Sequence, residues 1–282
     1  MFGRTALVLP GGGSLCIQQA GGLVGLHQAG FTPHLLYGAS GGGLNGALYY
    51  ADRWDAMDEL WSTIQTPNVY RSDPSTWWRA GGSSASLYDP APLLRTIRRY
   101  VGAAVVPRLD LKFQISATDI LCEQADTREF AQLADPALFL LASASVPVFF
   151  PPVEYEGRLL VDGGVLNNYQ VAQAIRDGAE TIVILSPSIW SPRDRRSIRN
   201  AASMLSATIS AAMHGYLERE LLFTQILNNV EGYRDVRIIK IDLPDMTRRD
   251  LLDFNLGPLA HRRWVMDECR KIARRTIERA AG

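Results

Sequence analysis

The stretch Leu35-Leu36-Tyr37-Gly38-Ala39-Ser40-Gly41-Gly42-Gly43-Leu44-Asn45-Gly46 decides how this chain folds. An apolar run typical of a buried strand leads into a Gly-x-Ser-x-Gly pentapeptide, and apolar residues then recur at helical spacing. A sharp turn from strand to helix holds its central residue in a sparsely populated backbone region, at a cost of about 1 to 3 kcal/mol. Gly38 and Gly42 leave room for the chain to double back. We therefore expect Ser40 to stand at the turn as a candidate nucleophile, with a structural turn serine as the alternative.

Length and composition narrow the class of protein. The chain has 282 residues, and because we find no internal repeat or clear linker, we expect one domain over residues 1–282 with a helical extension from about residue 245. The formal net charge of zero argues against a nucleic-acid partner held by a general positive field. The three cysteines lie far apart and the four histidines include no H-x-x-x-H pair, so we expect no disulfide framework, no metal and no cofactor.

The sequence also bears on membranes. A single Arg4 precedes the first apolar strand, without a charged n-region or a small-residue cleavage site, and no apolar run reaches about 18 residues. We expect a cytoplasmic protein that can still contact a membrane transiently. Residues 66–86 look like a long, lid-like loop, whose Trp77 and Trp78 suit either a membrane interface or a cover over the core. The basic residues of the loop at 190–199 and of the last helix suit anionic head groups, although a solvated surface explains them better.

A glycine-rich loop follows the first expected strand. Residues 5–10 form an apolar run that leads into Gly11, Gly12 and Gly13, and a helical pattern then extends to about Gly30. Backbone N–H groups at a helix N-terminus point at one spot and favour an anion there. The loop lacks the Gly-Lys-Ser/Thr ending of a phosphate-binding P-loop, and Ser40 stands where a dinucleotide site needs an acidic residue. We therefore expect an oxyanion hole, with a tight turn that binds nothing as the alternative.

A carboxylate ends a short strand in the second half of the chain. The expected strand at residues 158–161 runs into Asp162, Gly163 and Gly164. Open α/β sheets place functional groups at the carboxyl ends of their strands, which makes Asp162 a candidate general base. Asp-Gly is also a common turn pair, so the motif taken alone favours a turn aspartate.

Periodicity predicts the remaining elements. We expect helices over residues 51–64, 91–101, 136–143, 198–230 with a break near Gly215, and 262–281. We expect strands over residues 111–120, 123–130 as a hairpin partner, 181–186 and 236–241. Residues 142–153 form an apolar segment, Ala-Ser-Ala-Ser-Val-Pro-Val-Phe-Phe-Pro-Pro-Val, without a regular period.

Four motifs in this order resemble the patatin-like phospholipase family: the glycine loop, Gly-x-Ser-x-Gly, the Ala-Ser-Ala-Ser segment and Asp-Gly-Gly. The resemblance extends over residues 6–184, and residues 87–90 are similar too. It implies a three-layer α/β fold with a mostly parallel central sheet flanked by helices. It also implies a calcium-independent lipid acyl hydrolase whose dyad is Ser40 and Asp162 and whose oxyanion loop contains Gly11, Gly12 and Gly13. The family loop usually continues with a basic residue and another glycine, where this chain has Leu15 and Cys16.

The implied substrate is a lipid ester of the kind that phospholipase A or lysophospholipase enzymes cleave. Ser40 would attack the ester carbonyl, and Asp162 would accept the serine proton and return it to the leaving alcohol. One alternative is a Ser-His-Asp α/β-hydrolase, in which His214 or His261 follows Ser40 and Asp162 in the chain. Another is a lipid-binding protein that keeps the fold without catalysis.

Overall fold

The computed structural model describes residues 2–72, 86–102, 108, 110–187, 198, 201–231, 235–244 and 251–282. Of residues 201, 202 and 214 it describes only the backbone. The paired tryptophans Trp77 and Trp78 lie outside the described residues, as do the four arginines of the 190–199 loop, which are Arg193, Arg195, Arg196 and Arg199.

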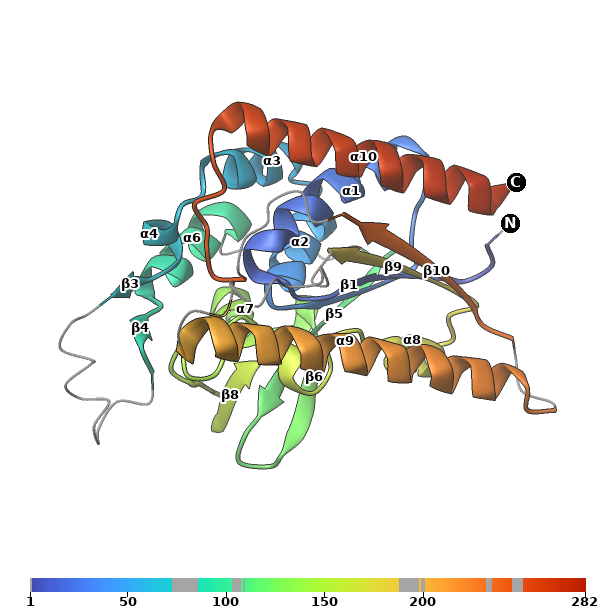
Figure 1. Ribbon diagram of the computed structural model, residues 1–282. Helices are drawn as coiled ribbons and strands as arrows, with labels where there is room; N and C mark the ends of the chain where they lie inside the picture. Colours follow the sequence, from blue (N-terminus) through green and yellow to red (C-terminus); the bar gives the residue numbers. More distant parts are fainter. Residues whose placement is uncertain are drawn as a thin grey trace.

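A mostly parallel sheet forms the centre of the molecule (Figure 1). The strand order is β10-β9-β1-β2-β5-β8-β7, and β6 pairs with β5. The parallel strands are β1 (Thr5–Leu9), β2 (Leu35–Ala39), β5 (Lys112–Asp119), β9 (Thr181–Pro187) and β10 (Arg237–Leu243). Antiparallel to β5 run β6 (Gln124–Glu129) and β8 (Arg158–Asp162), and β7 (Val153–Tyr155) pairs with β8.

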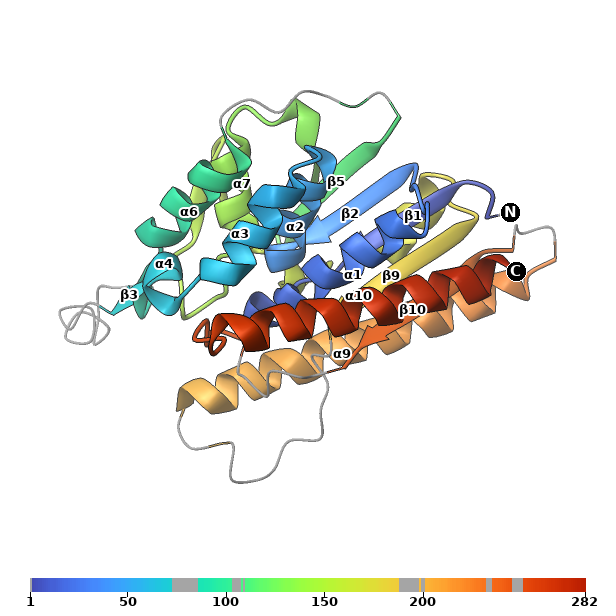
Figure 2. The same ribbon diagram turned by 90° about the horizontal axis from the view of Figure 1, so that it is seen from above.

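Helices cover both faces of this sheet (Figures 1 and 2). One face carries α1 (Cys16–Gln28), α2 (Ser40–Tyr50), α3 (Trp54–Thr63) and α10 (Leu259–Ala281), and α10 packs along α1. The opposite face carries α8 (Val171–Arg176) and α9 (Ala201–Asn228). Further helices, α4 (Thr66–Val69), α6 (Ala91–Val101) and α7 (Pro136–Ser143), pack beside α2 and β5, and short 3-10 turns are η1 (Gly13–Leu15), η2 (Phe130–Gln132) and η3 (Gly163–Val165).

Successive residues of a central strand contribute to two different buried layers, one on each face of the sheet. In β1, Leu7 and Leu9 join the core beneath α1 and α2, whereas Ala6 and Val8 join the core on the α8 and α9 side. Because both faces of β1, β2 and β9 are covered, these three strands are apolar along most of their length instead of alternating, whereas β10 at the sheet edge contains Lys240 and Asp242. The three-layer α/β fold that the sequence implied is confirmed.

Some expected elements differ from those observed. The region expected as a loop from residue 66 begins with α4 and with β3 (Arg71–Ser72), which pairs with β4 (Tyr88–Asp89). The expected break near Gly215 is wrong, because α9 continues through it. Among the described residues, no atom lies within 4 Å of a β-carbon placed at Gly215, so none of these neighbours requires glycine there. One glycine lowers helix stability by only about 1 kcal/mol. No residue pattern in the sequence predicted β7 or α8.

Candidate active site

Ser40 occupies the sharp turn between β2 and α2. Its φ of +51° lies in the left-handed region that residues with a side chain seldom adopt, and the residue is 6% exposed. The Ser40 amide donates to Oγ of Ser143 at 2.9 Å, and that hydroxyl donates to the Ser116 carbonyl oxygen at 2.7 Å. Through these two bonds, residues of the neighbouring α7 and β5 stabilise the strained turn. The expected strand–turn–helix unit is therefore present.

Close backbone packing explains the glycines around this turn. A β-carbon at Gly42 would lie 2.0 Å from the carbonyl oxygen of Leu9, and one at Gly38 would lie 2.7 Å from the α-carbon of Gly43. Real β-carbons do not approach other atoms so closely. The chain can therefore reverse at Ser40 only where these two positions carry no side chain.

The register of β5 brings Asp162 to Ser40. In β2, Ala39 pairs with Ser116, and in β8, Asp162 pairs with the next residue, Ala117. Because β6 occupies the other edge of β5, β2 and β8 share one edge and approach each other end to end. Ser40, which follows Ala39, and Asp162 therefore meet although 122 positions separate them in the sequence.

The Asp162 carboxyl lies in a dry environment. The residue is 2% exposed, and its Oδ1 accepts a hydrogen bond from the Gly164 amide at 2.7 Å. Burial raises the pKa of Asp162 to about 7, while the Gly164 amide and the nearby Ser40 hydroxyl act in the opposite direction. Within the described part of the chain, Oδ2 of Asp162 has no hydrogen-bond partner at normal bonding distance. The carboxyl can therefore take up a proton near neutral pH.

The two glycines after Asp162 also lie against other atoms. A β-carbon at Gly163 would lie 2.1 Å from the Ser116 carbonyl oxygen. At Gly164 it would lie 2.6 Å from the terminal methyl of Met213 and 2.9 Å from Oδ1 of Asp162. The two glycines therefore let the Asp-Gly-Gly turn pack directly against β5 and α9.

The glycine loop passes beside Ser40. A β-carbon at Gly11 would lie only 2.7 Å from that of Ser40, so the loop backbone is as near to the serine as packing allows. The Gly11 amide donates to Oδ1 of Asn168 at 2.8 Å and is therefore engaged. Among the described residues, the amides of Gly12 and Gly13 have no hydrogen-bond acceptor. These two amides are therefore available to a further acceptor.

Two helix N-termini converge at this place. A β-carbon at Gly41, in the first turn of α2, would lie 2.8 Å from Sγ of Cys16 and 3.2 Å from the Gly13 carbonyl oxygen. The partial positive charges of α1 and α2 therefore act on the same region. Burial raises the pKa of the Cys16 thiol, as does the Asp162 charge, so Cys16 stays neutral. Leu15 packs with Met213 and Leu251, which means that the sequence departure here fills a small apolar cluster.

Two side chains in this arrangement were not singled out by the sequence. Asn168, which is 2% exposed, links the glycine loop to the Asp-Gly-Gly turn, because its Oδ1 binds the Gly11 amide and lies beside Gly164. Ser143 holds the Ser40 amide, and the Ser145 carbonyl oxygen accepts a hydrogen bond from the Asp162 amide at 2.9 Å. The Ala-Ser-Ala-Ser motif was the available signal for Ser143, but Asn168 carried none beyond its place six residues after Asp162.

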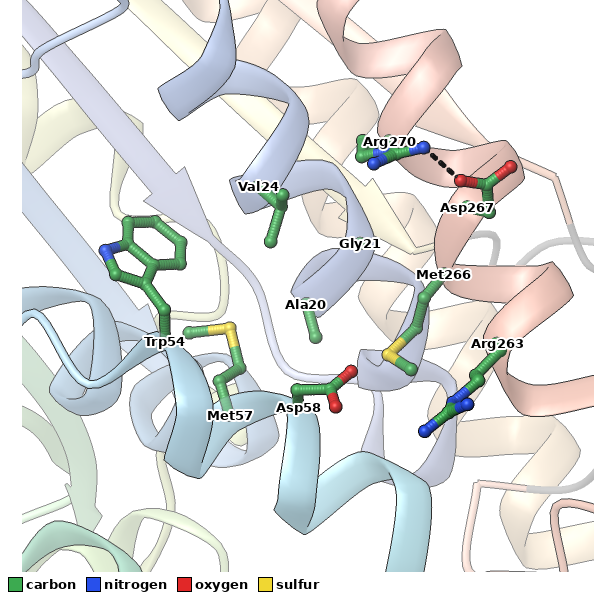
Figure 3. A pocket seen from close by; sticks show the side chains of 10 residues that line it. All are labelled: Ala20, Gly21, Val24, Trp54, Met57, Asp58, Arg263, Met266, Asp267 and Arg270. Carbon is green, nitrogen blue, oxygen red and sulfur yellow. Dashed lines mark hydrogen bonds and ion pairs between the residues drawn. The ribbon is translucent and has the colours of Figure 1, made fainter. Parts of the chain in front are cut away.

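A narrow apolar cavity of about 50 Å³ opens at Ser40. Its walls come from η1, α2, α3, α4, α6, α7, the 144–150 segment and residues after 250. Among the described residues that line it, Ser40 alone carries a hydroxyl group. An apolar cavity beside a nucleophile suits a hydrocarbon chain. A second hollow, of about 350 Å³, lies between α1, α3 and α10 and contains none of the predicted site residues (Figure 3).

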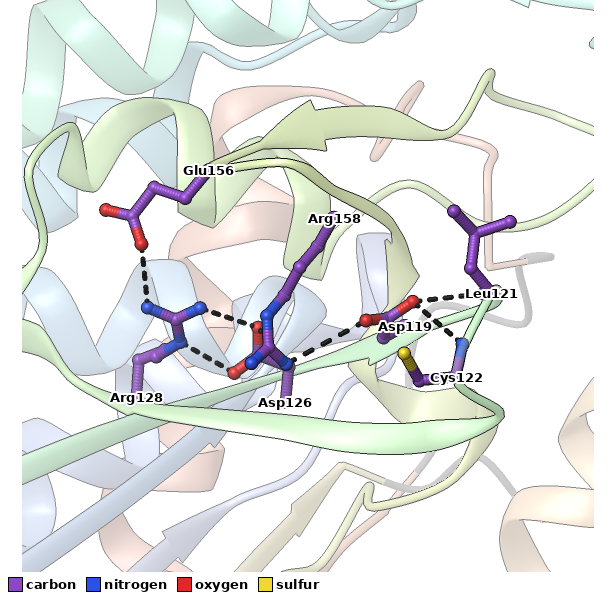
Figure 4. A network of polar contacts seen from close by, with 7 residues as sticks. All are labelled: Asp119, Leu121, Cys122, Asp126, Arg128, Glu156 and Arg158. Atoms are coloured by element: carbon purple, nitrogen blue, oxygen red, sulfur yellow. Dashed lines mark hydrogen bonds and ion pairs between the residues drawn. The ribbon is translucent and has the colours of Figure 1, made fainter.

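A network of charged side chains anchors β8 at the end opposite Asp162 (Figure 4). Arg158, the first residue of β8, lies 3.5 Å from Asp126 and 3.8 Å from Asp119. Arg128 in β6 binds Asp126 and also Glu156, at 2.9 Å from the latter. These contacts tie β8 to β5 and β6, which fixes the strand that carries Asp162.

The remaining expectations concern histidines, metals and membranes. The side chain of His214 lies outside what the structure describes, and His261 at the start of α10 stacks on Trp264. No three His, Cys, Asp or Glu side chains in the described ranges are grouped so that they could hold a metal ion. None of the helices that the structure describes combines the length and apolar character needed to cross a bilayer.

One family model and several curated proteins match this chain. The family model for patatin-like phospholipases matches residues 7–175. An uncharacterized NTE family protein of Mycobacterium tuberculosis is 27% identical over 184 residues, which are 65% of this chain and 49% of that protein. Lysophospholipase NTE1 of Debaryomyces hansenii is 28% identical over 183 residues, 64% of this chain and 11% of that protein. This chain therefore matches about half or less of these curated relatives.

Among solved structures, the crystal structure of VipD from Legionella pneumophila is similar over 94% of this chain and 66% of that chain. The TM-score is 0.42 and the sequence identity 12%. An overlap at this level bears on neither the site nor the activity.

Proposed function

Because this chain belongs to the patatin-like phospholipase family, we propose that it is a serine hydrolase that cleaves carboxylic esters of lipids. The observation that carries the proposal is the meeting of Ser40, at its strained turn, with the buried Asp162 carboxyl, whose pKa burial raises to about 7. A base whose pKa lies near the working pH is well suited to accept a serine proton. The apolar cavity at Ser40 supports a substrate with a hydrocarbon chain.

The proposed reaction has two halves. Oγ of Ser40 bonds to the ester carbonyl carbon while its proton passes to Oδ2 of Asp162, the oxygen that has no partner among the described residues. The Gly12 and Gly13 amides stabilise the negative charge that develops on the carbonyl oxygen, and each such donor contributes about 2.7 to 4 kcal/mol to lowering the barrier. The C–O bond to the alcohol then breaks, and the alcohol leaves with the proton from Asp162.

Water completes the cycle on the acyl-enzyme. It gives a proton to Asp162 as its oxygen attacks the acyl carbon, and Ser40 recovers its proton when the acid is released. Asp162 alternates between base and acid, a role that a carboxylate of ordinary pKa near 4 would perform poorly at neutral pH. The dry environment of Asp162 is therefore essential to the proposed dyad.

Release of fatty acid from a panel of lysophospholipids, phospholipids and neutral acylglycerols tests the proposal, with Ser40→Ala measured beside the parent protein. We expect the parent to release fatty acid from at least one lipid class, and the variant to do so about a thousandfold more slowly or not at all. Lipid binding by the parent without release from any class would favour the non-catalytic lipid-binding protein instead.

A further inference from the structure

A segment beyond the family match reaches the proposed active site. Residues 251–258, here called the strap, lead into α10 and lie outside the matched residues 7–175. The Leu251 carbonyl oxygen accepts a hydrogen bond from the Ser14 amide at 2.7 Å, and a β-carbon at Gly13 would lie 2.1 Å from that oxygen. The strap therefore lies directly against the glycine loop.

Hydrogen bonds from two side chains hold the strap in place. The Tyr70 hydroxyl donates to the Leu252 carbonyl oxygen at 3.1 Å. Arg262 is 5% exposed, and its guanidinium donates to the carbonyl oxygens of Gly257 at 2.9 Å and Ile64 at 2.6 Å. Desolvation of this cation is compensated by carbonyl oxygens from two segments, so the strap is joined firmly to the end of α3.

Two strap side chains form part of the wall of the cavity at Ser40. Leu252 and Phe254 line it together with side chains such as Leu44 and Trp61, whereas Leu256 of the same strap is buried elsewhere in the core. The cavity volume of about 50 Å³ is far below the roughly 300 to 1,000 Å³ of typical ligand pockets. The strap therefore limits the room next to the nucleophile.

We propose that Leu252 and Phe254 are specificity-determining residues that make the site at Ser40 favour esters with shorter acyl chains over those with longer ones. This inference rests on the proposed hydrolase function. A longer chain requires wall side chains to move apart, whereas a shorter chain fits between them. Removal of wall atoms should therefore favour longer chains selectively, because it enlarges the apolar cavity while Ser40 and Asp162 stay unchanged.

The test compares kcat/KM for p-nitrophenyl butyrate and p-nitrophenyl octanoate, both below their micelle-forming concentrations. The parent should prefer butyrate. Leu252→Ala and Phe254→Ala should raise the octanoate-to-butyrate ratio about tenfold or more. The larger side chain in Leu252→Phe should lower the ratio. The matched control Leu256→Ala removes the same atoms from the same strap outside the cavity and should leave the ratio unchanged.

The ratio of two rates from one sample is independent of the fraction of folded enzyme, and the milder Leu252→Val covers the case in which a truncation does not fold. An unchanged ratio in the cavity variants would overturn the inference, and so would an equal rise in Leu256→Ala. In both cases hydrolysis by the parent would leave the proposed function intact. If the parent hydrolysed neither of the two esters, the proposed function and this inference would be overturned together.

Discussion

The buried carboxyl of Asp162 should reduce the stability of the folded protein at neutral pH, and Asp162→Asn should restore that stability. Burial raises the pKa of Asp162 from 3.8 to about 7. A difference of about three pKa units corresponds to about 4 kcal/mol. The amide side chain cannot ionise, and its oxygen can still accept the hydrogen bond from the Gly164 amide, so the substitution removes mainly the cost of burying a charge.

The sign of the pH dependence follows from proton binding. Between about pH 4 and pH 7 the folded protein keeps the proton on Asp162, whereas the unfolded chain has released it. The contribution of the proton on Asp162 to the unfolding free energy is therefore complete below about pH 4. It falls by about 1.4 kcal/mol per pH unit until about pH 7. Above that pH it has been lost.

Urea unfolding of the parent and of Asp162→Asn at matched pH values measures this effect, because the other titrating groups cancel in the difference. The variant's advantage in unfolding free energy should grow from about pH 4 to about pH 7 and then level off, reaching about 4 kcal/mol. A difference that stays flat across this range would refute the reasoning, since it would mean that folding does not raise the pKa of Asp162.

Two further variants test the packing around the serine. Gly42→Ala should abolish folding or lower the melting temperature sharply, because its β-carbon would lie 2.0 Å from a β1 carbonyl oxygen. Gly215→Ala, whose β-carbon would meet none of the described residues within 4 Å, should instead stabilise the protein by about 1 kcal/mol. Equal melting temperatures of the two variants would contradict this. Asn168→Ala leaves the buried Gly11 amide without its acceptor, so urea unfolding should show a loss of about 1 to 3 kcal/mol and esterase assays a lower kcat. The neighbouring Asn167→Ala should change both much less, and equal losses in the two variants would exclude a special role for Asn168.

Sequence reasoning succeeded where the signal was local. The turn at Ser40 was predictable because glycines at fixed offsets leave few other conformations for the strand and helix that flank them. The long helix was found, but its expected break was wrong because a single Gly215 is too weak a signal to end it.

The contacts that join distant segments were not predictable from residue patterns alone. The resemblance to a family suggested Asp162, but only the register of β2 and β8 on one edge of β5 explains why it meets Ser40. Asn168 has no periodic or turn pattern to distinguish it, and the contact of the strap with the glycine loop depends on how α10 packs. Such contacts join residues that are distant in the sequence, and they form only when the strands and helices pack around the folded core.

The most direct test of the central claim is mass-spectrometric mapping of a fluorophosphonate probe on the folded protein. The probe should modify Ser40 in the parent and in a variant with His214→Ala and His261→Ala, while Asp162→Asn should react far more slowly, since Asp162 is the proposed base. Modification of another residue, or loss of labelling in the histidine variant with labelling retained in Asp162→Asn, would contradict the proposed Ser40–Asp162 dyad.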